Sequence, residues 1–553
     1  MNADVPLLNN HNFIWRFLRC AQQQPDKTAI VFTADSGTDE DSISFQGMHR
    51  EAAYWQAFFY AKNLQPGDRV VLAIAPGILL YTLITGLLAA GMVPVFIDAG
   101  MGRRKVRQAL QDANASAVIS SLAVLRWFWL IPELRGCQRF AVDGFFPGVR
   151  RLPVAQAVGA RDDRTRQLRL IDGGRHAHGL ISFTSGSTGR PKGADRTHDS
   201  LQQQHQAIRA HWPDAVDDVD CPCFPVMVLH NLSCGMTSVM PAVNFAAPGE
   251  LSQEQAARTV AALQQWRVTR VSGAPAYMSA LCDYLHAQQL VMEQVRSVIV
   301  GGATVSRTLA GKIQQCFPNA WGRIAYGSTE AEPVAAVTLE DYLQADGAAG
   351  YLVGAPVEGT EVLISHSLPA DHATEDMVTQ GQCQPYECGE ILVAGLHVLR
   401  GYVNHPQAEA ENKIPRNGSL YPVWHRTGDT GFFDSDGRLW LTGRVRDLIR
   451  CGELVIQPLV VEQQLDVLEG VQRCALVQSS EGKLLLFIQS EKTLAELMPV
   501  VRPLLMEAGI ASLTLKRLAR MPVDSRHNSK LDRPLLREDA SSLSVLEHHH
   551  VLC

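Results

Sequence analysis

The chain has 553 residues, with 50 lysines and arginines against 56 aspartates and glutamates, which gives a net charge of −6. It is too long for one ordinary domain, so we expect roughly two to four hydrophobic cores. The slightly acidic balance argues against a nucleic-acid partner, because nucleic-acid binding needs a basic surface. The twelve cysteines contain no Cys-x-x-Cys pair, and residues 1–12 lack the features of a signal peptide. Both observations favour reduced thiols in a cytoplasmic protein.

The N-terminal part alternates between candidate helices and strands. The pattern predicts a helix over 13–23, strands over 28–32 and 42–45, and a helix over 46–62. A further strand is expected over 117–120. Alternation on this spacing indicates a doubly wound α/β domain.

Residues 70–97 contain no charged residue and are long enough to span a bilayer. Proline and glycine interrupt them at Pro76-Gly77, Gly91 and Pro94. We therefore expect a strand, a helix and a second strand, buried on both faces of a sheet, and no transmembrane segment.

Residues 179–198 join a short apolar strand, 180–183, to a loop of hydroxyls and glycines, 184–189. Glycines let the backbone approach a ligand, and successive free N–H groups form a nest for anions. Lys192 adds a positive charge, so the loop predicts a polyphosphate site. It is not a Walker A loop, because Gly193 follows the lysine where that motif needs Ser or Thr. A Ser/Gly linker is the plain alternative, but linkers are seldom joined to an apolar strand.

Two further strands end in glycine turns, at 298–303 and 323–330. Ligands of open α/β sheets bind just beyond the carboxyl ends of the strands. We therefore expect both turns and the polyphosphate loop to meet in one crevice. Tyr326 offers an aromatic face for a base, and Glu330 offers a carboxylate for a hard cation.

The pattern changes over 351–441, where short strands and Asp-Gly turns predict a smaller β-rich subdomain with a polar loop at 371–387. Asp429 lies in a glycine turn between strands, where an aspartate is usually only a turn residue. Upstream, the apolar run 224–230 is expected to be a strand that ends in His230. A lone histidine at a strand end is usually structural.

From about Arg446 the expected elements shorten, to 460–468, 475–478, 484–489 and 493–508, which suggests a small α+β unit. Lys530 follows in a polar loop, where a lysine is by default a solvated surface residue. Residues 539–553 have no core pattern, and His548–His550 are a candidate for adventitious metal binding.

Taken together, these segments closely resemble the adenylate-forming superfamily, which includes acyl-CoA synthetases, peptide-synthetase adenylation domains and luciferases. The resemblance extends from about Phe13 to Glu538. It implies an α/β N-terminal AMP-binding domain over 1–445, with its β-rich subdomain over about 350–445. A small mobile α+β lid would follow over 446–538, with a tail over 539–553.

The resemblance also implies roles for individual residues. ATP would be held by Thr184, Ser185, Gly186, Ser187, Thr188, Gly189, Lys192, Gly301, Gly302, Ala303, Tyr326, Gly327, Thr329, Asp429 and Arg444. Glu330 would hold Mg²⁺, and the catalytic groups would be Lys530, Glu330 and Thr184. His230 would lie in the substrate pocket.

Two positions depart from the family's pattern. Arg446 stands at the lid hinge, where Asp or Lys is usual, and Ser529 precedes Lys530, where Gly is usual. The first departure concerns the hinge and not the fold.

The activity implied by the resemblance is that of a ligase of fatty-acid metabolism. It would join a carboxylic acid, a fatty or β-hydroxy fatty acid, to AMP and release pyrophosphate. The acyl group would then pass to CoA or to the phosphopantetheine thiol of an acyl carrier protein. Residues 97–102, 326–333 and 522–530 look most like the branch that contains olefin β-lactone synthetases, in which the substrate's own hydroxyl displaces AMP. The third alternative is an inactive homologue that only binds nucleotide.

Overall fold

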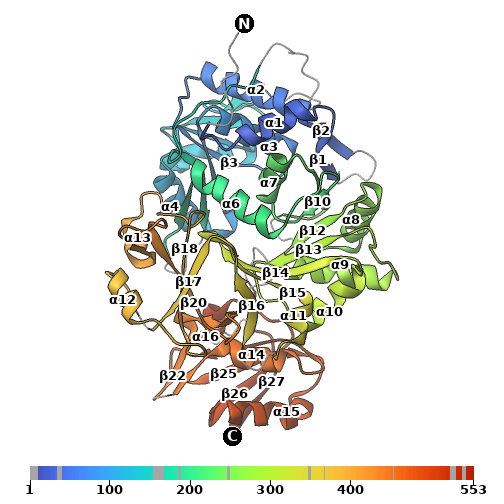
Figure 1. Cartoon of the computed structure of the whole chain (residues 1–553), viewed down its shortest axis with the longest axis vertical. Helices are drawn as coiled ribbons and strands as arrows, with labels where there is room; N and C mark the ends of the chain where they lie inside the picture. Colours follow the sequence, from blue (N-terminus) through green and yellow to red (C-terminus); the bar gives the residue numbers. More distant parts are fainter. Residues whose placement is uncertain are drawn as a thin grey trace.

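The structure, a computed structural model, describes residues 10–33, 40–153, 167–184, 189–245, 249–346, 350–366, 368–452, 454–523, 531–538 and 543–552. The N-terminal elements lie at one end of the molecule, the long sheet crosses the middle, and the C-terminal elements form the opposite end (Figure 1).

A seven-stranded sheet forms the first layer of the N-terminal half, in the order β7-β6-β5-β3-β4-β8-β9. Neighbouring strands are parallel except β8 and β9, which form an antiparallel pair at one edge. The strands are β3 (Arg69–Ala73), β4 (Val93–Ile97), β5 (Ala117–Ser120), β6 (Gln138–Ala141), β7 (Arg150–Arg151), β8 (His178–Thr184) and β9 (Lys192–Thr197).

The charge-free stretch 70–97 folds as predicted into β3, the helix α3 (Ile78–Ala89) and β4. Eleven of the twelve residues of α3 are buried, because the helix lies between the sheet and α2 (Phe45–Ala61). Among the described residues, no helix combines the length and apolarity needed to cross a bilayer.

The second sheet runs β17-β18-β20-β21-β16-β15-β14-β13-β12-β10-β11-β1-β2, with β19 added beside β20. Its pairs from β1 through β11, β10, β12 and β13 to β14 are parallel, and those from β14 to β17 are antiparallel. The parallel part contains β1 (Thr28–Thr33), β10 (Val219–Pro222), β11 (Thr237–Met240), β12 (Arg270–Gly273), β13 (Ser297–Gly301) and β14 (Trp321–Ser328). The antiparallel part contains β15 (Ala331–Thr338), β16 (Tyr351–Pro356), β17 (Thr360–Ser365), β18 (Gly389–Gly395), β19 (Lys413–Pro415), β20 (Val423–Phe433) and β21 (Leu439–Arg444), while β2 (Glu40–Ser44) closes the other edge.

The helices of the N-terminal half cover these sheets and supply the core. They are α1 (Trp15–Gln23), α4 (Arg103–Ala113), α5 (Leu122–Leu125), α6 (His198–His211), α7 (Met227–Cys234), α8 (Gln253–Gln265), α9 (Pro275–Ala287), α10 (Arg307–Cys316), α11 (Leu339–Gln344), α12 (Glu375–Gln380) and α13 (Pro406–Asn412). One core cluster joins α9 to the parallel strands through residues such as Leu281, Val298 and Ile324. A second joins α2 and α3 through Trp55, Phe59 and Leu87.

Two expectations about elements of the N-terminal half are wrong. Residues 224–230 do not form a strand that ends in His230, because α7 begins at Met227 and places His230 inside a helix. The polar loop expected over 371–387 contains the short helix α12. A short apolar run fits a strand or a buried helix equally well, and only packing decides between them.

The C-terminal unit is a four-stranded sheet, β24-β25-β26-β27, with its own helices. It contains β24 (Val471–Gln478), β25 (Leu484–Ser490), β26 (Ser512–Leu518), β27 (Val545–Leu552), α14 (Pro458–Asp466), α15 (Leu494–Glu507) and α16 (Arg533–Arg537), and it is preceded by the hairpin of β22 (Ile449–Cys451) and β23 (Leu454–Ile456). The tail therefore contributes to this core, contrary to the expectation for 539–553. The strand β27 contains both polar and apolar residues, and its backbone pairing with β26 holds it in the sheet. Its residue Val551 is buried.

Candidate active site

The strands β8 and β9 form the base of the hairpin that carries the polyphosphate loop. Thr184 is the last residue of β8 and pairs directly with Lys192, the first residue of β9. Gly189 has φ of 96°, a conformation that favours glycine. Of the residues predicted for this site, Ser185, Gly186, Ser187, Thr188 and Lys530 lie outside the described residues.

Charged side chains lie close to the aromatic ring of Tyr402, beside this hairpin. The Nζ atoms of Lys192 and Lys413 each lie 5.5 Å from the ring centroid. The Tyr402 hydroxyl donates a hydrogen bond to Glu330 Oε1 at 2.9 Å. Lys192, Glu330 and Lys413 therefore meet in one buried cluster, although they come from three distant parts of the chain.

Burial changes the proton affinities of this cluster. It lowers the pKa of Lys413 to about 7, although the nearby charge of Glu330 opposes the change. Burial by itself would raise the pKa of Glu330, but its neighbours His425 and Lys413 and the Tyr402 hydroxyl outweigh that effect and hold the pKa below its ordinary value. Glu330 is thus an ionised carboxylate at neutral pH, which is the form that a hard cation needs.

A second group of side chains lies at the end of β14. The Tyr326 hydroxyl donates to Asp429 Oδ2 at 2.8 Å, and Arg444 Nε lies 3.1 Å from Asp429 Oδ1. Asp429 and Arg444 are direct neighbours in the pairing of β20 with β21. The charge of Asp429 raises the pKa of Arg444, which keeps the guanidinium charged.

Arg196 ties the hairpin to the turn between β14 and β15. This fully buried side chain donates to Ser182 Oγ at 2.6 Å and to the Thr329 carbonyl at 3.0 Å. The Leu399 amide in turn donates to the Glu330 carbonyl at 2.8 Å. The turn that carries Thr329 and Glu330 is therefore fixed from two sides.

The glycines predicted for the adenine turn permit close packing on one side and leave space on the other. A Cβ atom on Gly301 would lie 2.8 Å from the Ala325 carbonyl oxygen. Gly302 has φ of 86°, and among the described residues beyond its chain neighbours a Cβ there would have only the Phe224 ring within 4 Å, at 3.9 Å. Ala303, which follows, is half-buried. The opposite turn is tight at Gly327, where a Cβ would lie 2.9 Å from the Ala331 carbonyl.

The chemistry of these groups fits ATP with a magnesium ion. Apart from its chain neighbours, no atom of the described residues lies closer than 3.9 Å to a Cβ built on Gly302, and Tyr326, on the neighbouring strand β14, donates to the Asp429 carboxylate. The buried Ser328 Oγ, on the same turn as Thr329, has no hydrogen-bond partner within the described ranges. Lys192 and the Glu330 carboxylate supply the charges for phosphate and cation.

A family model described as AMP-binding enzyme matches residues 17–403. The chain belongs to this family. Its members are ATP-dependent, adenylate-forming ligases that activate carboxylic acids, and the sequence-based identification is thereby confirmed.

Relatives in the AMP-binding family extend over nearly the whole chain. The olefin beta-lactone synthetase of Stenotrophomonas maltophilia is 30% identical over 96% of this chain and 98% of the relative. A long-chain-fatty-acid–CoA ligase of Bacillus subtilis is 25% identical over 82% of this chain and 80% of the relative. The structure of O-succinylbenzoate coenzyme A synthetase (MenE) from B. subtilis, in complex with ATP and magnesium ion, matches with a TM-score of 0.73 and 18% identity, and the match covers 94% of this chain and 99% of that chain. The predicted fold class, large N-terminal sheets with a small C-terminal domain, is confirmed.

Sequence reasoning missed several residues of this candidate site. Tyr402, Lys413, Arg196 and His425 carry no motif signal by themselves. Only the tertiary contact reveals that Tyr402 and Glu330 interact.

His230 lies on α7, a helix that carries none of the groups just described. It is buried on α7, beside His205, and burial lowers its pKa far below the ordinary value. The α7 segment approaches the adenine turn through Phe224, three residues before the helix begins. A place for His230 in the substrate pocket remains a prediction.

Proposed function

We propose that this enzyme activates a β-hydroxy fatty acid as its acyl-adenylate and then closes a β-lactone. The observation that carries the first step is the meeting of Lys192, Glu330 and Lys413 around Tyr402, next to the Tyr326–Asp429–Arg444 group. The similarity to an olefin beta-lactone synthetase over nearly the whole length favours the second step.

In the first half-reaction the substrate carboxylate attacks the α-phosphorus of ATP, the bond to pyrophosphate breaks, and an acyl-adenylate forms. Both reactants are anions, so the site must supply positive charge and orientation. Tyr326 and the Gly301–Ala303 turn would hold adenine, and Asp429 would accept hydrogen bonds from the ribose hydroxyls.

The hairpin of Thr184 and Lys192 would hold the phosphates that leave. A magnesium ion on Glu330 would neutralise phosphate oxygens. Lys530 would bridge the incoming carboxylate and the α-phosphate, as the resemblance to the family implies.

In the second half-reaction the β-hydroxyl oxygen attacks the acyl carbon, the bond to AMP breaks, and the hydroxyl proton is released. A four-membered lactone and AMP result, with no external thiol. The second candidate is a thioester-forming ligase, in which CoA or a carrier-protein thiol attacks the same carbon. The 25% identity to a long-chain-fatty-acid–CoA ligase favours that candidate.

The two candidates are separated by incubating the enzyme with ATP, magnesium and a β-hydroxy fatty acid, with and without CoA. We expect AMP and a lactone without CoA, detected by chromatography and mass spectrometry. The same acid without its hydroxyl is the matched control, and it should support pyrophosphate exchange but no rapid AMP release. AMP release that needs CoA would establish the thioester ligase instead. ATP binding without AMP from any acid in a broad panel would indicate an inactive homologue.

A further inference from the structure

Three potential metal ligands come together on α6 and α7, two helices that carry none of the residues assigned to ATP. One ligand atom each from His205, His230 and Cys234 lies within 4.8 Å of the others. The two imidazole rings have centroids 4.7 Å apart. His230 Nε2 lies 3.5 Å from Cys234 Sγ.

The local helix geometry places these ligands. His230 and Cys234 are four residues apart on α7, so they share one helix face. His205 projects from α6, a helix that begins at a Thr197 cap. The cluster therefore joins two helices that are separated in the chain by β10.

Both histidines are buried without the partners that buried histidines need. His205 is 2% exposed and His230 is 4% exposed. Both ring nitrogens of His205, and Nδ1 of His230, have no hydrogen-bond partner in the part of the chain that the structure describes. Leaving a buried polar group unsatisfied destabilises a protein, so two such rings in contact call for an explanation.

We propose that His205, His230 and Cys234 bind a zinc ion. Zinc takes imidazole nitrogen at about 2.0–2.1 Å and thiolate sulfur at about 2.3 Å, which in a tetrahedral site puts nitrogen and sulfur about 3.6 Å apart. The separation of 3.5 Å between His230 and Cys234 matches this value. Coordination through His230 Nε2 and one ring nitrogen of His205 would also give a partner to one of the three ring nitrogens that have none.

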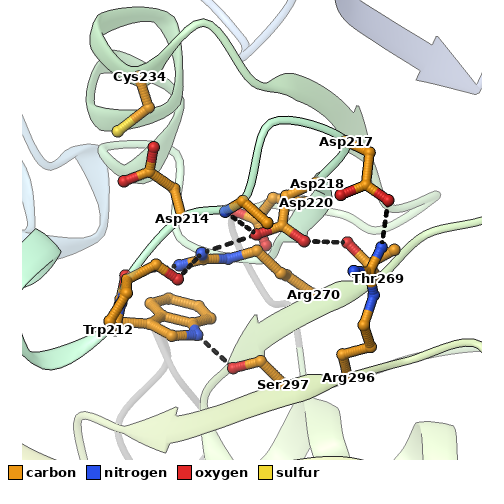
Figure 2. Close-up of polar contacts among 12 residues, drawn as sticks. Trp212, Asp214, Asp217, Asp218, Asp220, Cys234, Thr269, Arg270, Arg296 and Ser297 are labelled. Atoms are coloured by element: carbon orange, nitrogen blue, oxygen red, sulfur yellow. Dashed lines mark hydrogen bonds and ion pairs between the residues drawn. The ribbon is translucent and has the colours of Figure 1, made fainter.

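Three arginines, Arg16, Arg209 and Arg270, act on the two histidines, and carboxylates partly neutralise their positive charge. Arg209 is bonded to Asp214, and Arg270 is bonded to Asp218, so each guanidinium has a carboxylate beside it. Figure 2 shows the Asp214 carboxylate next to Cys234 at the end of α7. Asp214 is thus placed to offset part of the metal charge. Burial, followed by the charge of Asp214, raises the pKa of the Cys234 thiol to about 12, so the thiolate would form only as the metal displaces its proton.

The role of this zinc would be structural. It would tie α6 to α7 and so hold the segment that leads into α7, where Phe224 faces the Gly302 turn. The inference stands independently of which acid the enzyme activates.

The test is cobalt substitution in the full-length protein after removal of metals with a chelator. Two other sites could take up metal, namely the His366–Cys383–Glu387 group and the His548–His550 run. The parent protein therefore carries His366→Ala and alanine at positions 548–550. We expect one cobalt per chain, visible d–d bands of tetrahedral intensity and a thiolate-to-cobalt charge-transfer band, all reversed by zinc.

Cys234→Ser should abolish the charge-transfer band, while Cys451→Ser, which changes an exposed thiol, should leave it intact. Zinc should raise the melting temperature of the parent but not that of His205→Leu. If the histidines are merely unsatisfied, His205→Leu will stabilise the protein whether or not zinc is present, and the parent will show no cobalt spectrum. That result, or a charge-transfer band that survives Cys234→Ser, would overturn the proposal.

Discussion

Glu330 illustrates how this site depends on single residues. Its side chain is half-buried, accepts a hydrogen bond from Tyr402 and lies near Lys413 and Lys192. Each of these side chains carries a charged or proton-donating group that is largely shielded from water in the folded protein. A change at any one of them therefore alters the proton affinity of the others.

Lys530→Ala is the sharpest test of the residue that the family resemblance assigns to the first half-reaction. We expect pyrophosphate exchange to fall on the order of a hundredfold or more, because a point charge between two anions is lost. The second half-reaction should be largely spared when preformed acyl-adenylate is supplied. Full pyrophosphate exchange by the variant would exclude this role.

Lys413 makes the stability of the protein depend on pH in a defined direction. Its pKa is about 7 in the folded protein, against 10.5 ordinarily. Between these values the unfolded chain binds more protons than the folded one, so stability from this group rises with pH. Compared with Lys413→Met, the wild type should gain up to about 1.4 kcal/mol per pH unit above about pH 7, and nothing below it. Urea unfolding across this range measures the difference, and parallel curves for the two proteins would refute the assignment.

At the scale of elements, the C-terminal strand β27 closes the edge of its sheet. Val551 pairs with Leu513 and is buried in the same cluster as Leu486 and Leu515. The strand also contributes Glu547, which is bonded to Arg517 on β26. Its mixed composition hides it in the sequence, because apolar periodicity is weak in a short edge strand.

Val551→Asp should destabilise the C-terminal sheet by roughly 2–4 kcal/mol, because an unpaired carboxylate would replace a buried side chain. His548→Asp introduces the same group at an exposed position of the same strand and serves as the control. Thermal unfolding measures both variants. Equal melting temperatures would show that β27 does not seal this core.

At the scale of the whole molecule, the C-terminal unit has a core of its own. Its two clusters contain only residues from 449 onward, whereas the N-terminal clusters are built around α2, α3 and α9. The units join at Asp447, which pairs with Arg533 and Arg537, and at the packing of α14 against β21. We propose that residues 446–538 form the lid domain, with β27 added to it.

This division predicts two unfolding transitions in calorimetry. Leu486→Ala should lower the transition of the C-terminal unit, and Leu281→Ala should lower that of the N-terminal half. Each change removes a fully buried side chain, so each should cost about 2–5 kcal/mol. A single transition that both variants lower equally would show that the units unfold as one.

Sequence reasoning was most accurate where the signal is local. The strand–helix–strand unit over 70–97 and the strands that end at Gly301 and Ser328 follow from runs of apolar residues and from glycine turns. It was wrong for 224–230, because the second half of this apolar run forms the start of the helix α7 and not a strand. Periodicity over seven residues cannot distinguish the two, whereas burial against α1 and β11 can.

The sequence by itself determined the family, the α/β class and the residue types available for nucleotide chemistry, because these depend on motifs and periodicity within short segments. Only the tertiary structure decided which of those residues meet. Tyr402 contacts Glu330, which is 72 positions away in the sequence, and His205 contacts His230 although β10 separates their helices in the chain. Such contacts arise from how sheets and helices pack, and that packing also sets the burial that shifts each pKa. The residues next to Lys413, Tyr402 or Cys234 in the sequence do not indicate this packing.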